Sequence, residues 1–289
     1  MKHKFLILVV ALFMSVNVIA KKQVVYVEHF SRVSDLGTAW TEWVRGAVIS
    51  SLHHYQHLQI IDVDSQSSLS EEKQRRADDE EAFLDDETVR NGKMKKLGAN
   101  YVVQGFISNM DVKEIVNEKG KKSYDGGLSY SIKVVDCELG TLVSTDMFSC
   151  SAKHGKSIDD CIQKMLKNIP KHMKTIVTKD FKINSIILDS DFESKDGKLL
   201  KCFINCGETD GVVPGTVFAV KKAILTAGRI SWTEIGEIVV ESIVAGDLSS
   251  CKVKKGATEI NAALEEIITI KEEDPNNAHN LIVESKSFK

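Results

Sequence analysis

The chain of 289 residues is poor in proline and in aromatic residues, with three prolines and 7% Phe, Trp and Tyr. It also lacks a strong charge of either sign, since its formal net charge is −3. Few prolines and 43% hydrophobic residues are typical of a folded chain with enough apolar material for two cores. The charge balance argues against the basic domain or stripe that nucleic-acid binding usually needs. We therefore expect no nucleic-acid partner.

Familiar catalytic motifs are also missing. Gly155-Lys156-Ser157 stands before a predicted helix, but the first glycine of a phosphate-binding loop would have to fall at Cys150. A Gly-x-Ser-x-Gly nucleophile turn is absent. We therefore predict no catalytic residue and no cofactor, and a protein that is not an enzyme.

The first twenty residues hold the one long apolar run. Lys2, His3 and Lys4 make a basic start, Phe5–Met14 is uninterrupted and apolar, and Val18-Ile19-Ala20 supplies modest residues for cleavage. The run is short for a membrane span, and the pattern predicts a secretory signal peptide over residues 1–20. No cysteine follows it, so a lipid anchor is not expected. The mature protein would start near Lys21 in the periplasm.

Six cysteines occur in the predicted mature chain, and an exported protein can form disulfides. Cys202 and Cys206 are four residues apart in a predicted strand, too far to bond to each other. A bond from Cys251 to either of them stays open. The other three are Cys137, Cys150 and Cys161.

Two groups of residues have ligand-like spacing, yet we predict no metal site. His53 and His57 are four apart, but a third ligand is not evident, so we interpret them with His54 as a surface cluster at a helix end. The acidic residues of 189–193 alternate in an extended segment, and we interpret them as a solvated loop rather than a calcium site. They are Asp189, Asp191 and Glu193.

The first half predicts an α/β domain over residues 21–180. Val24–Val27 and Leu58–Val63 are apolar strands on either side of a helix that starts near Thr38. Trp40 and Trp43 recur on that helix at a spacing typical of core packing.

A charged stretch, 65–81, and a second helix, 86–97, come next in the predicted first domain. Strands follow at 101–116, 128–136 and 141–148, of which the second alternates cleanly. Ser157 is predicted to cap a helix to about residue 178, kinked at Pro170.

The second half contains short strands separated by glycine turns, which predicts a small β-barrel or sandwich over residues 181–270. The remainder, 271–289, is polar and is predicted to be a disordered tail. The fold class is therefore α/β (α+β): an N-terminal mixed sheet with packed helices, then a small C-terminal β-barrel-like domain.

The first domain resembles a known protein family in several sequence segments. They are the strand Val24–Val27, the helix of Trp40 and Trp43, Leu58-Gln59-Ile60-Ile61-Asp62, the run from Lys96 to Gly105, and the hairpin from Val134 to Thr141. The run Leu-Gly-Ala-Asn-Tyr-Val-Val-Gln-Gly is the most specific. The family is that of the curli secretion protein CsgG, with the TolB N-terminal domain and LpoB as relatives.

The second domain is similar to the small C-terminal domain of the flagellar protein FlgT. The likeness rests on Asn205-Cys206-Gly207, Asp210-Gly211-Val212, the run from Pro214 to Val220, and Ile235-Gly236-Glu237-Ile238.

These resemblances imply an exported envelope accessory protein. It would bind envelope proteins and help assemble or regulate a secretion, cell-wall or surface-structure complex, with peripheral outer-membrane association. Two alternatives stay open: a CsgG-like channel component, which would be a homo-oligomer, and an unrecognised hydrolase. The chain lacks the lipidated cysteine of the curli channel. Charges in the hairpin, such as Asp111, Lys113 and Glu114, favour a soluble sheet extension over membrane strands.

Overall fold

The computed structural model describes residues 22–33, 37–62, 98–227, 229–273 and 281–288. Two compact units divide them, one of Gln23–Phe181 and one that begins at Lys182. The predicted signal peptide 1–20, the charged stretch 65–81 and the helix 86–97 lie outside the described residues.

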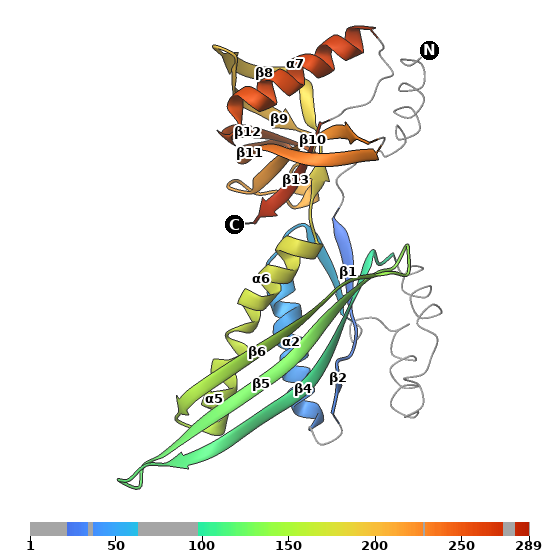
Figure 1. The fold of residues 1–289 in the computed structure, drawn as a ribbon. Coiled ribbons are helices and arrows are strands. Elements are labelled where there is room, and N and C mark those ends of the chain that lie inside the picture. Colours follow the sequence, from blue (N-terminus) through green and yellow to red (C-terminus); the bar gives the residue numbers. More distant parts are fainter. Residues whose placement is uncertain (1–21, 34–36, 63–97, 228, 274–280, 289) are drawn as a thin grey trace. The chain divides into compact units, whose positions relative to one another are not determined.

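The first unit is built on a mixed sheet with the order β3-β1-β4-β5-β6, in which β2 pairs with β4 (Figure 1). β1 pairs in parallel with β3 and β4, whereas β4, β5 and β6 are antiparallel. The mixed sheet that the sequence predicts is therefore confirmed. Its strands are β1 Gln23–Val27, β2 Ser31–Arg32, β3 Leu58–Asp62, β4 Tyr101–Val116, β5 Lys122–Asp136 and β6 Leu142–Gly155.

Three helices cover one face of this sheet (Figure 1): α2 Thr38–Leu52, α5 Ile158–Leu166 and α6 Ile169–Asp180. Each buries apolar residues at steps of three and four, for example Val44 and Val48 on α2 and Met173 on α6. The alternation of β5 sends Tyr130 and Ile132 to the same side. The core of the unit lies between these helices and the sheet.

The single kinked helix expected over residues 157–178 is instead two helices. α5 ends at Leu166 and α6 starts at Ile169, with Pro170 in its first turn. Proline lacks the N–H that a helix interior needs, but the first turn has no use for it. The predicted cap is confirmed, because the Ser157 hydroxyl accepts a hydrogen bond of 3.1 Å from the Asp160 amide.

The second unit contains a sheet with the order β7-β13-β10-β11-β12-β9-β8. β7 and β8 lie at opposite ends of this order, yet only Ile186 separates them in sequence. The sheet is therefore curled into a nearly closed barrel, as the sequence predicts. Its elements are β7 Asn184–Ser185, β8 Ile187–Lys195, β9 Lys198–Ile204, the 3-10 turn η3 Glu208–Asp210, β10 Val217–Thr226, β11 Arg229–Ala245, β12 Leu248–Lys255, the helix α7 Ala257–Glu273 and β13 Leu281–Ser287.

The predicted disordered tail over residues 271–289 is wrong for its described part. β13 pairs with both β10 and β7, and Leu281 and Val283 are buried. Ser285 is buried too, where its hydroxyl accepts a 2.9 Å hydrogen bond from the Ile183 amide. The strand is stable here because Leu281 and Val283 enter the core and its partners satisfy its buried polar groups.

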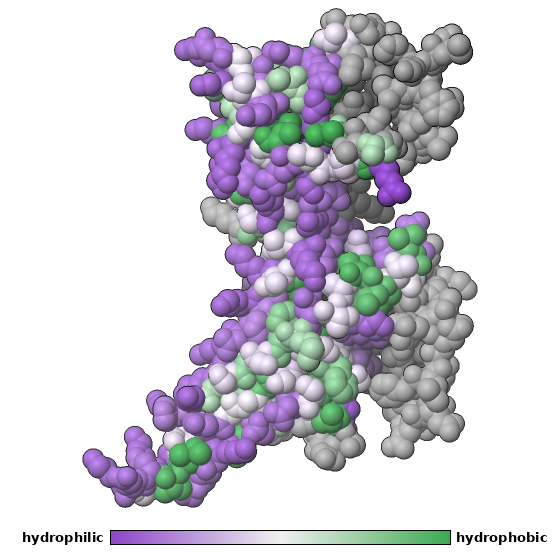
Figure 2. All heavy atoms as spheres, in the orientation of Figure 1, coloured by the Kyte–Doolittle hydropathy of each residue, from purple (hydrophilic) through white to green (hydrophobic). Residues whose placement is uncertain are grey.

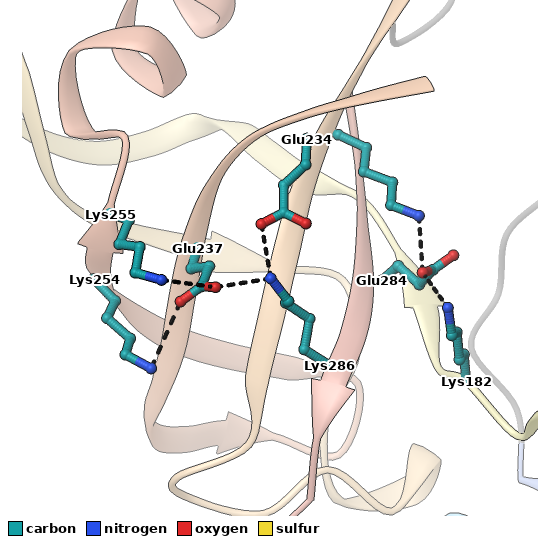
Figure 3. A network of polar contacts seen from close by, with 8 residues as sticks. Lys182, Glu234, Glu237, Lys254, Lys255, Glu284 and Lys286 are labelled. Carbon is teal, nitrogen blue, oxygen red and sulfur yellow. Dashed lines mark hydrogen bonds and ion pairs between the residues drawn. The ribbon is translucent and has the colours of Figure 1, made fainter. Parts of the chain in front are cut away.

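Ion pairs tie β13 to its neighbour β10 and, across β10, to β11 (Figure 3). Lys286 lies 2.8 Å from both Glu234 and Glu237 of β11. The hydrogen bond from Lys286, and to a smaller extent the one from Lys255, lowers the pKa of Glu237 to about 2. Glu284 accepts from two further lysines, Lys182 at 2.7 Å and Lys221 at 2.8 Å.

Candidate functional site

The edge of β6 that pairs with no other described strand is the candidate functional site in the first unit. β6 is an outer strand of the sheet, with β5 as its neighbour, and it extends over 14 residues. Strands in globular proteins average about 5–6 residues. From Ser144 to Ala152 the pairing with β5 is regular, and the register shifts lie near the strand ends. A long regular edge presents a row of backbone N–H and C=O groups to a further strand.

The composition of β6 offers little to block such pairing. Edge strands are usually protected by lysine, proline, bulges or short length. β6 contains no proline, and its charged residues are Asp146 and Lys153. The Asp146 carboxylate is held 2.9 Å from the Lys179 ammonium of α6. Met147, in the middle of the regular stretch, is 82% exposed.

The sheet face beside this edge, opposite the helices, carries small polar and scattered apolar residues. Phe106, Ser131 and Met147 form one row across β4, β5 and β6. The next row is Asn109, Ser129 and Ser149. Figure 2 views this face, where pale and green spheres run along the middle of the strands. Phe106 and Met147 are exposed on it, and of the two only Met147, on β6 itself, would contact a strand added at this edge.

Beyond the helices, the β4–β5 hairpin is charged. Lys122 lies 2.9 Å from Glu114, and Lys113 lies 3.5 Å from Asp111. Charges on a lipid-facing strand cost a few kcal/mol each near mid-bilayer. The hairpin is thus poorly suited to span a membrane.

A cluster of titratable residues that sequence reasoning missed lies between β5, β6 and α6. The Tyr130 hydroxyl is 2.9 Å from His172 Nδ1, and the Cys150 Sγ atom is 3.9 Å from the same nitrogen. Phe148 stacks on the His172 ring with centroids 4.5 Å apart. Forty-two residues separate Tyr130 from His172, so only the packing of α6 on the sheet joins them.

This cluster is ill suited to nucleophilic catalysis. A cysteine reacts as its thiolate, and burial raises the pKa of Cys150 to about 11. Burial, helped by Lys171, lowers the pKa of His172. A neutral thiol beside a neutral imidazole forms a structural contact at neutral pH.

A second missed cluster sits at the carboxyl end of β1. The Arg45 guanidinium, from α2, donates to the backbone oxygens of Val27 and Glu28 and to the Asp62 carboxylate at the end of β3. Arg45 is buried, and its planar guanidinium links α2 to β1 and β3 through these hydrogen bonds. It is therefore a structural link rather than an accessible anion site.

The predicted surface cluster of histidines is wrong for His57. α2 ends at Leu52, so His53 and His57 do not share a helical face. His53 and His54 are exposed, but His57 is buried. Its Nε2 atom lies 3.1 Å from the Phe181 carbonyl oxygen. His57 is buried because it immediately precedes β3 and lies against the residue that follows α6.

No group of three or more metal-type ligands converges within the described residues. The side chains of Asp189 and Asp191 lie outside them, and Glu193 is exposed on β8. All six cysteines are buried, and none forms a disulfide in the structure. Cys202 of β9 and Cys251 of β12 are directly paired across the two strands. The disulfide from Cys251 to Cys202 or Cys206 that the sequence left open is nevertheless not formed in the structure.

The expected core position of Trp43 is wrong, since Trp43 is 45% exposed, and Trp40 is half-buried. Trp43 borders a shallow depression of about 450 Å³ between α2 and α5. Gly46 and Ala47 leave this space beside the indole because their side chains are small. The other residues that line it are Glu42, Gln163, Leu166 and Lys167.

Comparison with known proteins gives only distant likenesses. No protein-family model and no curated protein matches the chain. Solved structures that resemble it include the hypothetical protein CT253 from Chlamydia trachomatis, at 13% identity and a TM-score of 0.37, over 54% of this chain and 95% of that one. Lipoprotein GNA1162 from Neisseria meningitidis has 14% identity and a TM-score of 0.37, over 53% and 99%.

The LpoB C-terminal domain from Escherichia coli also resembles the chain, at 16% identity and a TM-score of 0.30, over 49% of this chain and 91% of that domain. TM-scores this low carry no argument about function, which has to be argued from the geometry of the chain itself. Among the described residues, no helix is both long and apolar enough to cross a membrane.

Proposed function

We propose that this chain is an exported cell-envelope accessory protein that acts by binding another protein, through addition of a partner strand to β6. The observation that carries the proposal is the long, regular and sparsely charged edge of β6. Strand addition uses backbone hydrogen bonds for affinity and alternate side chains for specificity. The envelope location follows from the predicted signal peptide.

Side chains around the edge fit this role. Met147 supplies an exposed apolar contact on the edge strand itself, and methionine adapts to irregular partners. Serines on the same face supply hydroxyl groups, among them Ser149, which lies 3.4 Å from Ser129. The partner segment would be extended, with apolar residues alternating along it.

The test is a pull-down of the tagged full chain from the envelope of its own cells, followed by hydrogen exchange on the complex. We expect a discrete partner protein and slower exchange of the β6 amides when it is bound. Met147→Lys with Ser149→Lys places two cations on the edge and should abolish the capture. Leu200→Lys, at an exposed position of β9, is the control and should retain it.

Capture that survives the two β6 lysines, or protection confined to other strands, would overturn the proposal. A native mass that is a multiple of the chain mass, abolished by the same lysines, would instead identify the partner strand as a second copy. That result would favour the oligomeric alternative.

A further inference from the structure

The outer parts of β10 and β11 form an arm that is apolar on its surface. Its strands pair from Lys222 opposite Thr233 to Thr226 opposite Arg229 (Figure 1). We call residues 222–226 and 229–233 the β10–β11 arm. Every residue of its second strand is exposed. Paired residues point to the same side of a sheet and successive ones alternate.

Large apolar side chains are exposed on this arm. Trp232 is 45% exposed, Ile230 is exposed as well, and Ile224, opposite Ser231, is exposed on the other face. Trp232 and Ile230 are two residues apart, so they share a face, and Ala223 lies opposite Trp232. Tryptophan, with an apolar ring and a polar N–H, is enriched at interfaces and in membrane-interface belts.

The charges of the arm are cationic. It contains Lys222 and Arg229 and no Asp or Glu. Lys222 is paired with Glu266 of α7, whereas Arg229 makes no ion pair among the described residues and is exposed beside the turn, on the face opposite Trp232 and Ile230. The first carboxylate beyond the arm, Glu234, is already paired with Lys286 (Figure 3).

We propose that the β10–β11 arm docks on a lipid bilayer that carries anionic headgroups. Tryptophan is favoured at the interface between headgroups and acyl chains, and arginine is attracted to anionic lipid. The exposed apolar area of the arm is on the order of 200 Å², far below the ~800 Å² per partner of a stable protein interface. A bilayer accepts such a small apolar and cationic element. This proposal does not depend on the β6 edge.

The test uses two single-tryptophan versions of the full chain and phosphatidylglycerol vesicles with brominated acyl chains, which quench tryptophan that enters the bilayer. One version keeps Trp232 (Trp40→Phe, Trp43→Phe). The other keeps Trp43 (Trp40→Phe, Trp232→Phe). Both indoles are 45% exposed, and the chain has three tryptophans, so Trp43 is a matched control. Residues 1–20 contain no tryptophan.

We expect the Trp232 emission to be quenched and shifted to shorter wavelength, and the Trp43 emission to be unchanged. Ile230→Asn in the Trp232 version should weaken the quenching isotherm roughly tenfold, by loss of one apolar contact. Val244→Asn, at an exposed apolar position near the other end of β11, should leave the isotherm unchanged. Phosphatidylcholine vesicles should give weaker quenching, because they lack the anionic headgroup.

Unquenched Trp232, or equal quenching of Trp43, would overturn the proposal. A wavelength shift of Trp232 that depends on protein concentration without vesicles would also overturn it, in favour of a second copy on the arm. Loss of β6 capture would leave all these readouts unchanged, so the two proposals fail separately.

Discussion

The Nε2 atom of His57 lies 3.1 Å from the carbonyl oxygen of Phe181, which is 124 residues further along the chain. This contact joins the start of β3 to the end of α6 inside the first unit. Burial lowers the pKa of His57 to about 4, and the hydrogen bond to Phe181 opposes the shift only in part. The imidazole is therefore neutral in the folded protein.

We expect the first unit to lose stability in mild acid because of His57. The ordinary pKa of a histidine is 6.5, whereas that of His57 is about 4 when folded, so protons bind the unfolded chain more readily below pH 6.5. The contribution is fully present above pH 6.5 and declines as the pH falls toward 4, by up to about 3 kcal/mol. Urea unfolding at pH 7.5 and 4.5 measures it.

His57→Asn should flatten this pH dependence relative to the wild type. His53→Asn, at an exposed position, should leave it unchanged. Equal slopes for the wild type and His57→Asn would show that another group is responsible.

Tyr130→Phe, which removes the hydroxyl, should destabilise the first unit by about 1 kcal/mol, the net value of one hydrogen bond. Tyr130 is buried and its hydroxyl lies 2.9 Å from His172 Nδ1. Tyr124→Phe is the matched control, because its 3.3 Å hydrogen bond to Glu114 is exposed and should contribute a few tenths of a kcal/mol at most. Denaturant unfolding of the two variants compares them, and equal losses would contradict the expectation.

Gly126→Ala should destabilise by about 1–3 kcal/mol through overpacking. A Cβ atom there would lie 2.9 Å from Cys161 Sγ and 3.1 Å from Met165 Cε, both on the buried face of α5. Gly127→Ala is the control. Its Cβ would meet the end of the partly exposed Asp111 side chain at 3.1 Å, which can move aside. Thermal unfolding should give Gly127→Ala a midpoint close to that of the wild type and Gly126→Ala a lower one. A lower midpoint for Gly127→Ala than for Gly126→Ala would show that α5 does not pack against Gly126.

The cysteines should react very slowly with a disulfide reagent in the native protein at pH 8. All six are buried thiols outside any disulfide, and burial raises the pKa of Cys202 and Cys206 to about 12. In denaturant, six thiols should titrate at once. A count of four would reveal a disulfide, and fast labelling of the native chain would show that the cores open readily.

Several elements follow from local pattern alone. The alternation from Leu128 to Val134 specifies β5, and Ser157 specifies the start of α5, because side-chain period and cap chemistry act within a few residues. The recurring glycine turns predict the barrel-like second unit for the same reason. The β6 edge was not foreseeable from residues 142–155, since a strand is an edge only by its place in the sheet order.

Local sequence therefore determined which segments of this protein form strands and helices and roughly where they end. Tertiary structure decided what each face meets: His57 became buried, Trp43 became exposed, and residues 281–287 became a strand between β7 and β10. The physical reason is that periodicity is a property of one segment, whereas burial and edge position depend on partners far away in sequence. A short strand such as β13 forms only where those partners supply the hydrogen bonds and bury its apolar residues.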